Sequence, residues 1–70
     1  MSMQIMVTVN GKSRSVTHPA SLLDLLGALE LDPRTVVVEV NREIVRRPFL
    51  GDTLLQEGDR VELVHFVGGG

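Results

Sequence analysis

The sequence predicts a two-layer α+β domain, in which one main helix packs on one face of a mixed sheet of four or five strands. Seventy residues suffice for one small domain. A single segment has the apolar spacing of a helix, and the segments around it have the alternation or the β-branched composition of strands. Because one helix cannot cover both faces of such a sheet, we expect two layers.

The chain begins with a predicted β-hairpin. Residues Met3 to Val9 alternate in the period of a half-buried strand. Asn10-Gly11 follows, and this dipeptide favours a two-residue hairpin turn because both residues adopt positive φ at low cost. The return strand, Lys12 to Thr17, is mostly polar, with Val16 as its only large apolar residue. We therefore expect it at an edge of the sheet.

A helix is predicted after this hairpin. Ser21 and Asp24 have the spacing of a capping box. Four leucines at helical spacing define one face of this helix: Leu22, Leu25, Leu26 and Leu29. Leu23 is expected to widen that face. Gly27 costs about 1 kcal/mol relative to alanine, so we expect it either to pack closely against the sheet or to shorten the helix. Asp32-Pro33 is expected to end the segment.

Three more strands are expected in the second half of the chain. Val36 to Val40 is rich in β-branched residues and is the best candidate for a central strand. A short strand begins at Ile44-Val45, and a last strand covers Arg60 to Phe66. Its inward residues are expected to be Val61, Leu63 and Val67. The irregular connection before this last strand is expected to bury part of its apolar surface, which comes from four large residues: Phe49, Leu50, Leu54 and Leu55.

This element order favours one topology. The helix serves as the crossover, so the first and last strands are expected to lie side by side and parallel in the centre of the sheet. That is the β-grasp arrangement, the fold of ubiquitin. We predict a single β-grasp domain over residues 1–66 and a flexible C-terminal glycine tail over residues 67–70.

Composition excludes several classes of function. The chain has no cysteine, and His18 and His65 have no third candidate ligand near them, so we expect no metal site. A net charge of −2, without Tyr or Trp, argues against nucleic-acid binding. No apolar run reaches the length of a membrane span. In the absence of such a run we expect a cytoplasmic protein. We also find no nucleophile–base pair and no phosphate-binding loop, so we expect no catalytic residue.

The segment Val67-Gly68-Gly69-Gly70 directly follows the last predicted strand. Glycine has no Cβ and permits close approach of other backbone. Three extended glycines span about 10 Å, so the tail is long enough to carry a carboxylate into the active site of a partner. A frayed chain end is the alternative interpretation.

Five segments, in chain order, carry a resemblance to a known family: Met3-Gln4-Ile5 leading to Asn10-Gly11, Ser21 to Leu26, Val38 to Asn41 with Glu43 to Val45, Gly58 to Glu62, and His65 to Gly70. The chain resembles the sulfur carrier proteins of thiamine biosynthesis, the ThiS family of ubiquitin-like proteins. Two residues depart from that pattern, since the family often has glycine in place of Arg42 and proline in place of Arg46.

The resemblance implies a covalent cosubstrate, not an enzyme. An E1-like adenylyltransferase is expected to use ATP and magnesium to adenylate Gly70, and sulfur from a persulfide enzyme then yields a thiocarboxylate. Thiazole synthase accepts this sulfur for the thiazole ring of thiamine. The tail residues expected to enter the partner active sites are Val67, Gly68, Gly69 and Gly70. The carrier itself is expected to bind no cofactor.

Val64 and Phe66 lie on one face of the last strand and are the candidate docking patch for partner enzymes. They would alternatively lie beneath the connection from Phe49 to Leu55. His65 is interpreted as a strand residue and not as a general base. The arginines near these elements pair with acidic groups of a partner or are solvated surface charges: Arg46, Arg47 and Arg60.

Two other functions that use the C-terminus remain open, besides a non-covalent β-grasp binding module, which would not need a free terminus. The small subunit of molybdopterin synthase resembles this chain in fold and chemistry, but that group tends to be longer and often has prolines before the final Gly-Gly. Here Phe66-Val67 occupies that approach. The second alternative is a ubiquitin-like modifier that is conjugated to lysines through its C-terminus.

Overall fold

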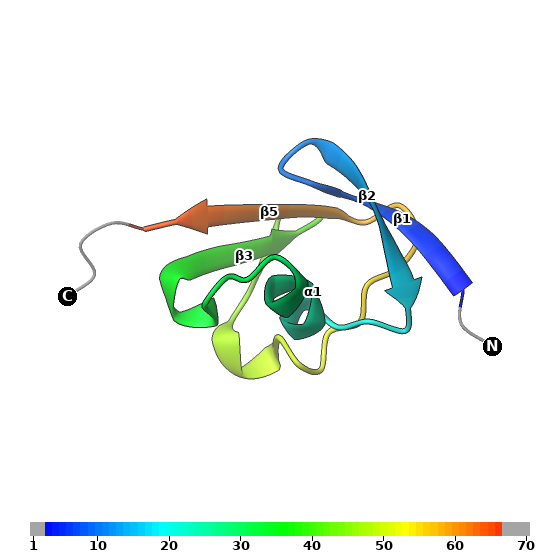
Figure 1. Cartoon of the computed structure of the whole chain (residues 1–70). Coiled ribbons are helices and arrows are strands. Elements are labelled where there is room, and N and C mark those ends of the chain that lie inside the picture. The colour runs from blue at the N-terminus through cyan, green and yellow to red at the C-terminus, as the bar shows by residue number, and fades with distance from the viewer. Residues whose placement is uncertain (1–2, 67–70) are drawn as a thin grey trace.

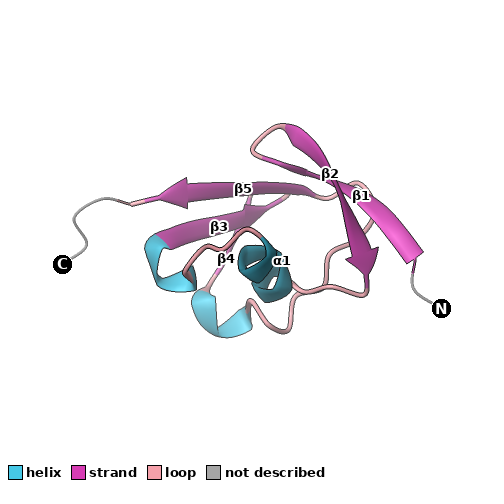
Figure 2. Ribbon diagram, in the orientation of Figure 1, coloured by secondary structure: helices cyan, strands magenta, loops and turns pink. Residues whose placement is uncertain are grey.

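The computed structural model describes residues 3–66 of the chain. Figure 1 shows the main helix packed against one side of a twisted sheet, and Figure 2 also draws the short 3₁₀ helices in cyan. The elements in chain order are β1 (Met3–Val9), β2 (Lys12–His18), α1 (Leu22–Ala28), the 3₁₀ helix η1 (Pro33–Thr35), β3 (Val36–Val40), β4 (Glu43–Val45), the 3₁₀ helix η2 (Arg47–Phe49) and β5 (Arg60–His65).

The sheet has five strands in the order β2-β1-β5-β3-β4. Strands β1 and β5 pair in parallel, and the other neighbours are antiparallel. The predicted parallel pair of first and last strands is therefore confirmed, as are the edge position of β2 and the β-grasp fold. Strand β5 is the middle strand, and β3 lies one place further out between β5 and β4.

Both hairpins turn on a two-residue loop with positive φ at each position. Asn10 and Gly11 have φ values of 50° and 82°, and Asn41 and Arg42 have values of 52° and 72°. Such loops match the right-handed twist of the flanking strands. The Asn10-Gly11 turn was predicted. The Asn41-Arg42 turn has the same conformation although an arginine occupies the position that glycine favours.

Helix α1 begins as predicted and ends early. Ser21 Oγ accepts a hydrogen bond from the Asp24 N–H at 3.0 Å, and Asp24 Oδ2 accepts one from the Ser21 N–H at 2.9 Å. The helix ends at Ala28, so Asp32-Pro33 is not its end. Instead, Asp32 caps the first turn of η1. The prediction for the end was wrong because Glu30 adopts φ of 58°, which closes the helix before its proline signal.

One expectation for α1 was wrong, and one of the two alternatives for Gly27 is excluded. Leu23 is 44% exposed, because it lies outside the face formed by Leu22, Leu25 and Leu26. Gly27 does not pack closely against the sheet, since a Cβ added there would meet no atom within 4 Å. The helix does end one residue after Gly27.

The core lies between α1 and the sheet. It consists of buried apolar residues from the helix, from three strands of the sheet and from the connection between β4 and β5: Ile5, Val7, Leu22, Leu25, Leu26, Val36, Val38, Leu50, Leu55, Val61 and Leu63. The connection between β4 and β5 contributes only Leu50 and Leu55, while Phe49 and Leu54 are exposed. The expectation that this connection buries part of its apolar surface is therefore confirmed. This segment alternates inward and outward as it follows the start of α1, where the Leu55 N–H donates to the Ala20 carbonyl at 2.8 Å.

Among residues 3–66, no helix is long and apolar enough to cross a membrane. The same part of the chain contains no group of three or more His, Asp or Glu residues placed to hold a metal ion.

Candidate functional site

The candidate site lies where β5 ends, because the proposed tail continues from there in sequence. Phe66 is the last residue that the structure describes, and its N–H donates to the Thr35 carbonyl at 3.3 Å. This bond joins the end of β5 to η1, which precedes β3. The predictions for Val67, Gly68, Gly69 and Gly70, including modification of Gly70, lie outside the described residues.

The docking patch, Val64 and Phe66, is accessible. Val64 is 52% exposed and Phe66 is 49% exposed. Val64 pairs with Val37 on the sheet face that is opposite to α1, and Leu63 faces the core. Half of each side chain is thus available to a partner. That a partner docks there remains a prediction.

An acidic pair adjoins this patch on the same open face of the sheet. Glu39 of β3 lies directly across from Glu62 of β5, and the exposed Ile44 of β4 lies across from Glu39 on its other side. Like charges placed directly opposite each other destabilise a sheet by a modest amount. The open face near the patch therefore combines apolar side chains with negative charge.

An open groove of about 570 Å³ lies beside the docking patch. Its walls come from η1, the first half of β3, β4, η2 and the end of β5. The lining residues are Pro33, Arg34, Val36, Val37, Val38, Ile44, Val45, Arg46, Arg47, Pro48, Leu50 and Phe66. Figure 2 draws both 3₁₀ helices on the side of the molecule toward which β5 runs. Sequence reasoning identified Arg46, Arg47 and Phe66 separately but did not bring them together.

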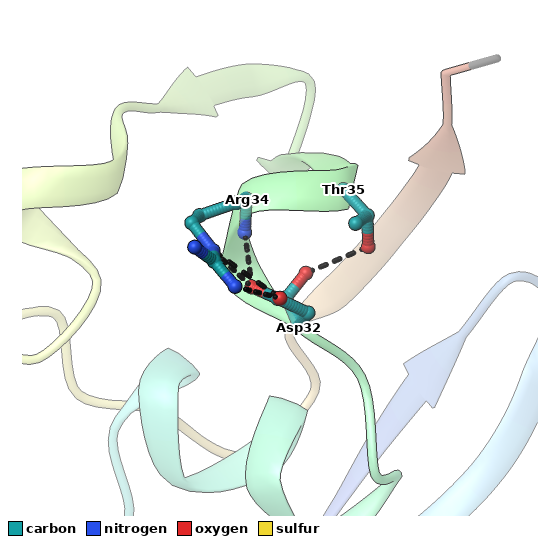
Figure 3. Close-up of polar contacts among 3 residues, drawn as sticks. All are labelled: Asp32, Arg34 and Thr35. Atoms are coloured by element: carbon teal, nitrogen blue, oxygen red, sulfur yellow. Dashed lines mark hydrogen bonds and ion pairs between the residues drawn. The ribbon is translucent and has the colours of Figure 1, made fainter. Parts of the chain in front are cut away.

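An ion pair lies at the start of η1, beside one wall of this groove. Arg34 Nη2 lies 2.8 Å from Asp32 Oδ2, and Asp32 Oδ1 accepts a further bond from the Arg34 N–H at 2.9 Å (Figure 3). Hydrogen bonds from the side chain and the backbone N–H of Arg34 lower the pKa of Asp32 from 3.8 to about 2, with a smaller contribution from the positive charge of Arg47. The same pairing raises the pKa of Arg34.

The remaining predicted residues are dispersed. Arg60 is at the opposite end of β5 from the docking patch, and its N–H donates to Asn41 Oδ1 at 3.0 Å. His65 is exposed at the end of β5, and His18 ends the edge strand β2. Within residues 3–66 no cluster of potential metal ligands includes either histidine.

Comparison with known proteins agrees with this geometry. The family model for ThiS matches residues 7–70. The sulfur carrier protein ThiS of Bacillus subtilis is 36% identical over 66 residues, which cover 93% of this chain and 100% of that protein. The chain belongs to the ThiS family. A crystal structure of the family member from Geobacter metallireducens, described as a thiamine biosynthesis protein, superposes with a TM-score of 0.82 at 36% identity. It covers 94% of this chain and 100% of that one.

This chain also resembles part of a larger enzyme. A thiazole synthase of Magnetococcus marinus is 39% identical over 64 residues, which are 91% of this chain and 20% of that protein. A thiazole synthase of Paramagnetospirillum magneticum is 38% identical over the same shares. The chain therefore spans about a fifth of the length of these two relatives.

The two departures from the ThiS pattern fall at distinct places in the structure. Arg42 is in the β3–β4 turn with φ of 72°, which explains why glycine suits that position. Arg46 follows β4 and precedes η2 in an extended conformation with φ of −72° and ψ of 152°. Proline fits these angles, so arginine here adds a charge to the groove without altering the backbone.

Proposed function

We propose that this chain is a sulfur carrier of thiamine biosynthesis, which carries sulfur as a thiocarboxylate on Gly70. The observation that carries the proposal is the match to the ThiS family model, which runs through Gly70. The alignment with the B. subtilis carrier, which includes that protein's whole length, supports it. The resemblance of the chain to part of two thiazole synthases supports thiazole synthase as the acceptor enzyme.

The proposed chemistry uses the carboxylate of Gly70 and no side chain of the carrier as a catalyst. An E1-like adenylyltransferase joins this carboxylate to the α-phosphate of ATP, with magnesium, and releases pyrophosphate. The persulfide sulfur of a donor enzyme attacks the acyl carbon, and AMP leaves. A thiol then cleaves the sulfur–sulfur bond and forms a disulfide with the donor, so that the thiocarboxylate remains on Gly70. ATP and magnesium are held by the activating enzyme, and the reaction takes place in the cytoplasm.

In this proposal the folded domain serves as a handle for the tail. Strand β5 lies in the middle of the sheet with β1 and β3 on its two sides, so its end has a defined position in the fold. The exposed Val64 and Phe66 give a partner an apolar contact close to the first tail residue. A partner that binds this patch thereby positions Val67 to Gly70 for entry into its active site.

The test is a reconstitution with enzymes from the same organism. The full chain is incubated with the activating enzyme, ATP, magnesium and a persulfide donor, and its intact mass is measured. We expect the mass gain of one exchange of oxygen for sulfur, located at Gly70 by fragmentation, and none in a variant that lacks Gly70. A series of larger protein adducts without this exchange would contradict the proposal and support a protein modifier instead.

A further inference from the structure

Strand β4 is shorter than β3, so the first half of β3 has no pairing strand on the β4 side. Strand β3 pairs with β5 over its whole length, from Val36 to Val40, but with β4 only from Val38 to Val40. The chain turns away after Val45 and enters η2. A strand position next to Val36 and Val37 is therefore empty in the part of the chain that the structure describes.

The backbone of Val36 is directed to that empty position. In an antiparallel pair, alternate residues point their N–H and C=O groups to the same neighbour. The two-residue hairpin places Val40 and Val38 toward β4, so Val36 faces the same side. The bond from the Phe66 N–H to the Thr35 carbonyl agrees with this assignment. It shows that the backbone of Thr35 faces β5, so the backbone of the next residue, Val36, faces the other side. Within residues 3–66 the backbone of Val36 has no hydrogen-bond partner on the β4 side.

The groove described above lies over this free strand edge. Its apolar lining includes Ile44, Val45, Pro48, Leu50 and Phe66, and its charged residues are all arginines: Arg34, Arg46 and Arg47. Arg34 is paired with Asp32. Arg46 and Arg47 form no ion pair with any residue of the described range 3–66. The groove thus offers two available cations beside an apolar surface and an unpaired strand edge.

We propose that this groove receives an extended segment of thiazole synthase that carries both carboxylate and apolar side chains. The segment adds beside β3 in line with β4, exchanges backbone hydrogen bonds with Val36, and places carboxylates against Arg46 and Arg47. Addition of a strand to a sheet edge is a common mode of peptide recognition, in which main-chain bonds supply affinity and side-chain pockets supply specificity.

The inference rests on the proposed function, because the choice of thiazole synthase follows from it. The site is also well placed for that partner. Phe66 lines the groove and is the residue from which the tail continues in sequence. A partner that holds the groove therefore contacts the carrier next to the origin of the tail, and Arg46 gives this chain a contact that the common proline would not provide.

The first test is equilibrium binding of the full chain to thiazole synthase from the same organism. We expect Arg46→Gln/Arg47→Gln to weaken binding about tenfold at low salt, with a smaller difference at high salt because the charges are then screened. The matched control, Lys12→Gln/Arg14→Gln, removes the same charge from the distant edge strand β2 and should alter binding by less than about twofold. Equal losses in both variants, or none in the first, would overturn the proposal.

The second test reports on the backbone contact. Amide hydrogen exchange is allowed to proceed either in the free carrier or in its complex with thiazole synthase. The remaining amide protons of the carrier are then measured by NMR. We expect the Val36 amide to exchange at least about tenfold more slowly in the complex, whereas the Val38 amide, which β4 already covers, should change little. Exchange of Val36 at the same rate in both states would refute strand addition.

These tests separate the groove from the proposed function. Formation of the Gly70 thiocarboxylate and its use by thiazole synthase, without any effect at Val36 or of the arginine variant, would refute the groove alone. Binding with the predicted arginine and amide dependence, without thiocarboxylate formation, would refute the carrier chemistry alone. Absence of any binding to thiazole synthase would refute the groove proposal.

Discussion

The side chain of Asn10 takes the place of a strand residue against Leu63. Asn10 Oδ1 accepts a hydrogen bond from the Leu63 N–H at 2.8 Å, and Asn10 Nδ2 donates to the Leu63 carbonyl at 3.2 Å. Strand β1 has already ended at Val9, so its backbone no longer pairs with this part of β5. The turn residue thereby extends the sheet contact of the strand that leads to the tail.

Replacement of Asn10 by glycine should destabilise the domain. Glycine keeps the positive φ of the turn but leaves the N–H and carbonyl of Leu63 without this partner, at a cost of about 1–3 kcal/mol. Urea unfolding followed by circular dichroism measures this change as a lower midpoint. An unchanged midpoint in Asn10→Gly would show that water replaces the amide without loss.

Replacement of Arg42 by glycine should have the opposite effect. Arg42 has φ of 72°, a conformation that disfavours side chains with a Cβ, and no side-chain hydrogen bond of Arg42 is present within residues 3–66. Removal of this strain should stabilise the domain by up to about 1 kcal/mol, although glycine also gains freedom in the unfolded chain. Thermal unfolding provides the measurement, and a lower melting temperature in Arg42→Gly would contradict the strain argument.

Replacement of Ser21 by alanine should destabilise the domain by about 1 kcal/mol. Ser21 is buried and its hydroxyl accepts the Asp24 N–H, which otherwise has no partner at the start of a helix of seven residues. The exposed Ser13, for which no side-chain bond is present within residues 3–66, serves as the control in Ser13→Ala. Equal unfolding midpoints for the two variants would argue against the cap.

The fold was predictable because its signals are local. Alternation identified β1, the Asn10-Gly11 pair identified the first turn, and Ser21 with Asp24 identified the start of α1. The end of α1 was not predictable from Asp32-Pro33, because the helix stops at Ala28, just before Glu30 adopts φ of 58° and donates its N–H to the Gly27 carbonyl. Phe49 and Leu54 are exposed because the irregular segment turns them outward, and no simple period encodes such turns.

The site was predictable only in part. The glycines of the tail are visible in the sequence, and Val64 and Phe66 follow from the alternation of the last strand. The groove is assembled from η1, β3, β4, η2 and Phe66, and only the sheet order brings Arg34, Arg46 and Phe66 to one place. The bond of Asn10 to Leu63 was also missed, because the dipeptide predicts the turn and not the use of the amide.

The ionisation of Asp32 should depend on Arg34. Its folded pKa is lowered from 3.8 to about 2 by hydrogen bonds from Arg34, so the pairing stabilises the fold above the unfolded pKa. This stabilisation is lost as the pH falls from about 4 toward 2. NMR titration of the Asp32 carboxyl carbon should give a midpoint near 2 that moves toward 3.8 in Arg34→Gln. An identical midpoint in the variant would contradict this cause.

A side chain at Gly69 should impair activation but not folding. In the proposed reaction the tail enters a narrow channel of the activating enzyme, where a Cβ would clash, whereas residue 69 follows the folded core in sequence. Gly69→Ala should therefore unfold at the wild-type midpoint and form adenylate at least about tenfold more slowly in a pyrophosphate-release assay. Adenylation at the wild-type rate would refute the channel argument.

A residue added after Gly70 should abolish carrier function. The proposed chemistry requires a glycine carboxylate at that position, so a chain extended by one alanine should not restore growth without thiamine to cells that lack the carrier. Restored growth, with mass analysis showing that the added residue is still present, would contradict this expectation.

Sulfur transfer itself tests the account most directly. The thiocarboxylate on Gly70 is prepared with a heavy sulfur isotope and incubated with thiazole synthase and its precursors, and the isotope content of the thiazole product is measured by mass spectrometry. The account predicts that the thiazole sulfur carries the label and that the carrier returns to the carboxylate. A thiazole product without the label, or a thiocarboxylate that remains intact while thiazole forms, would contradict it.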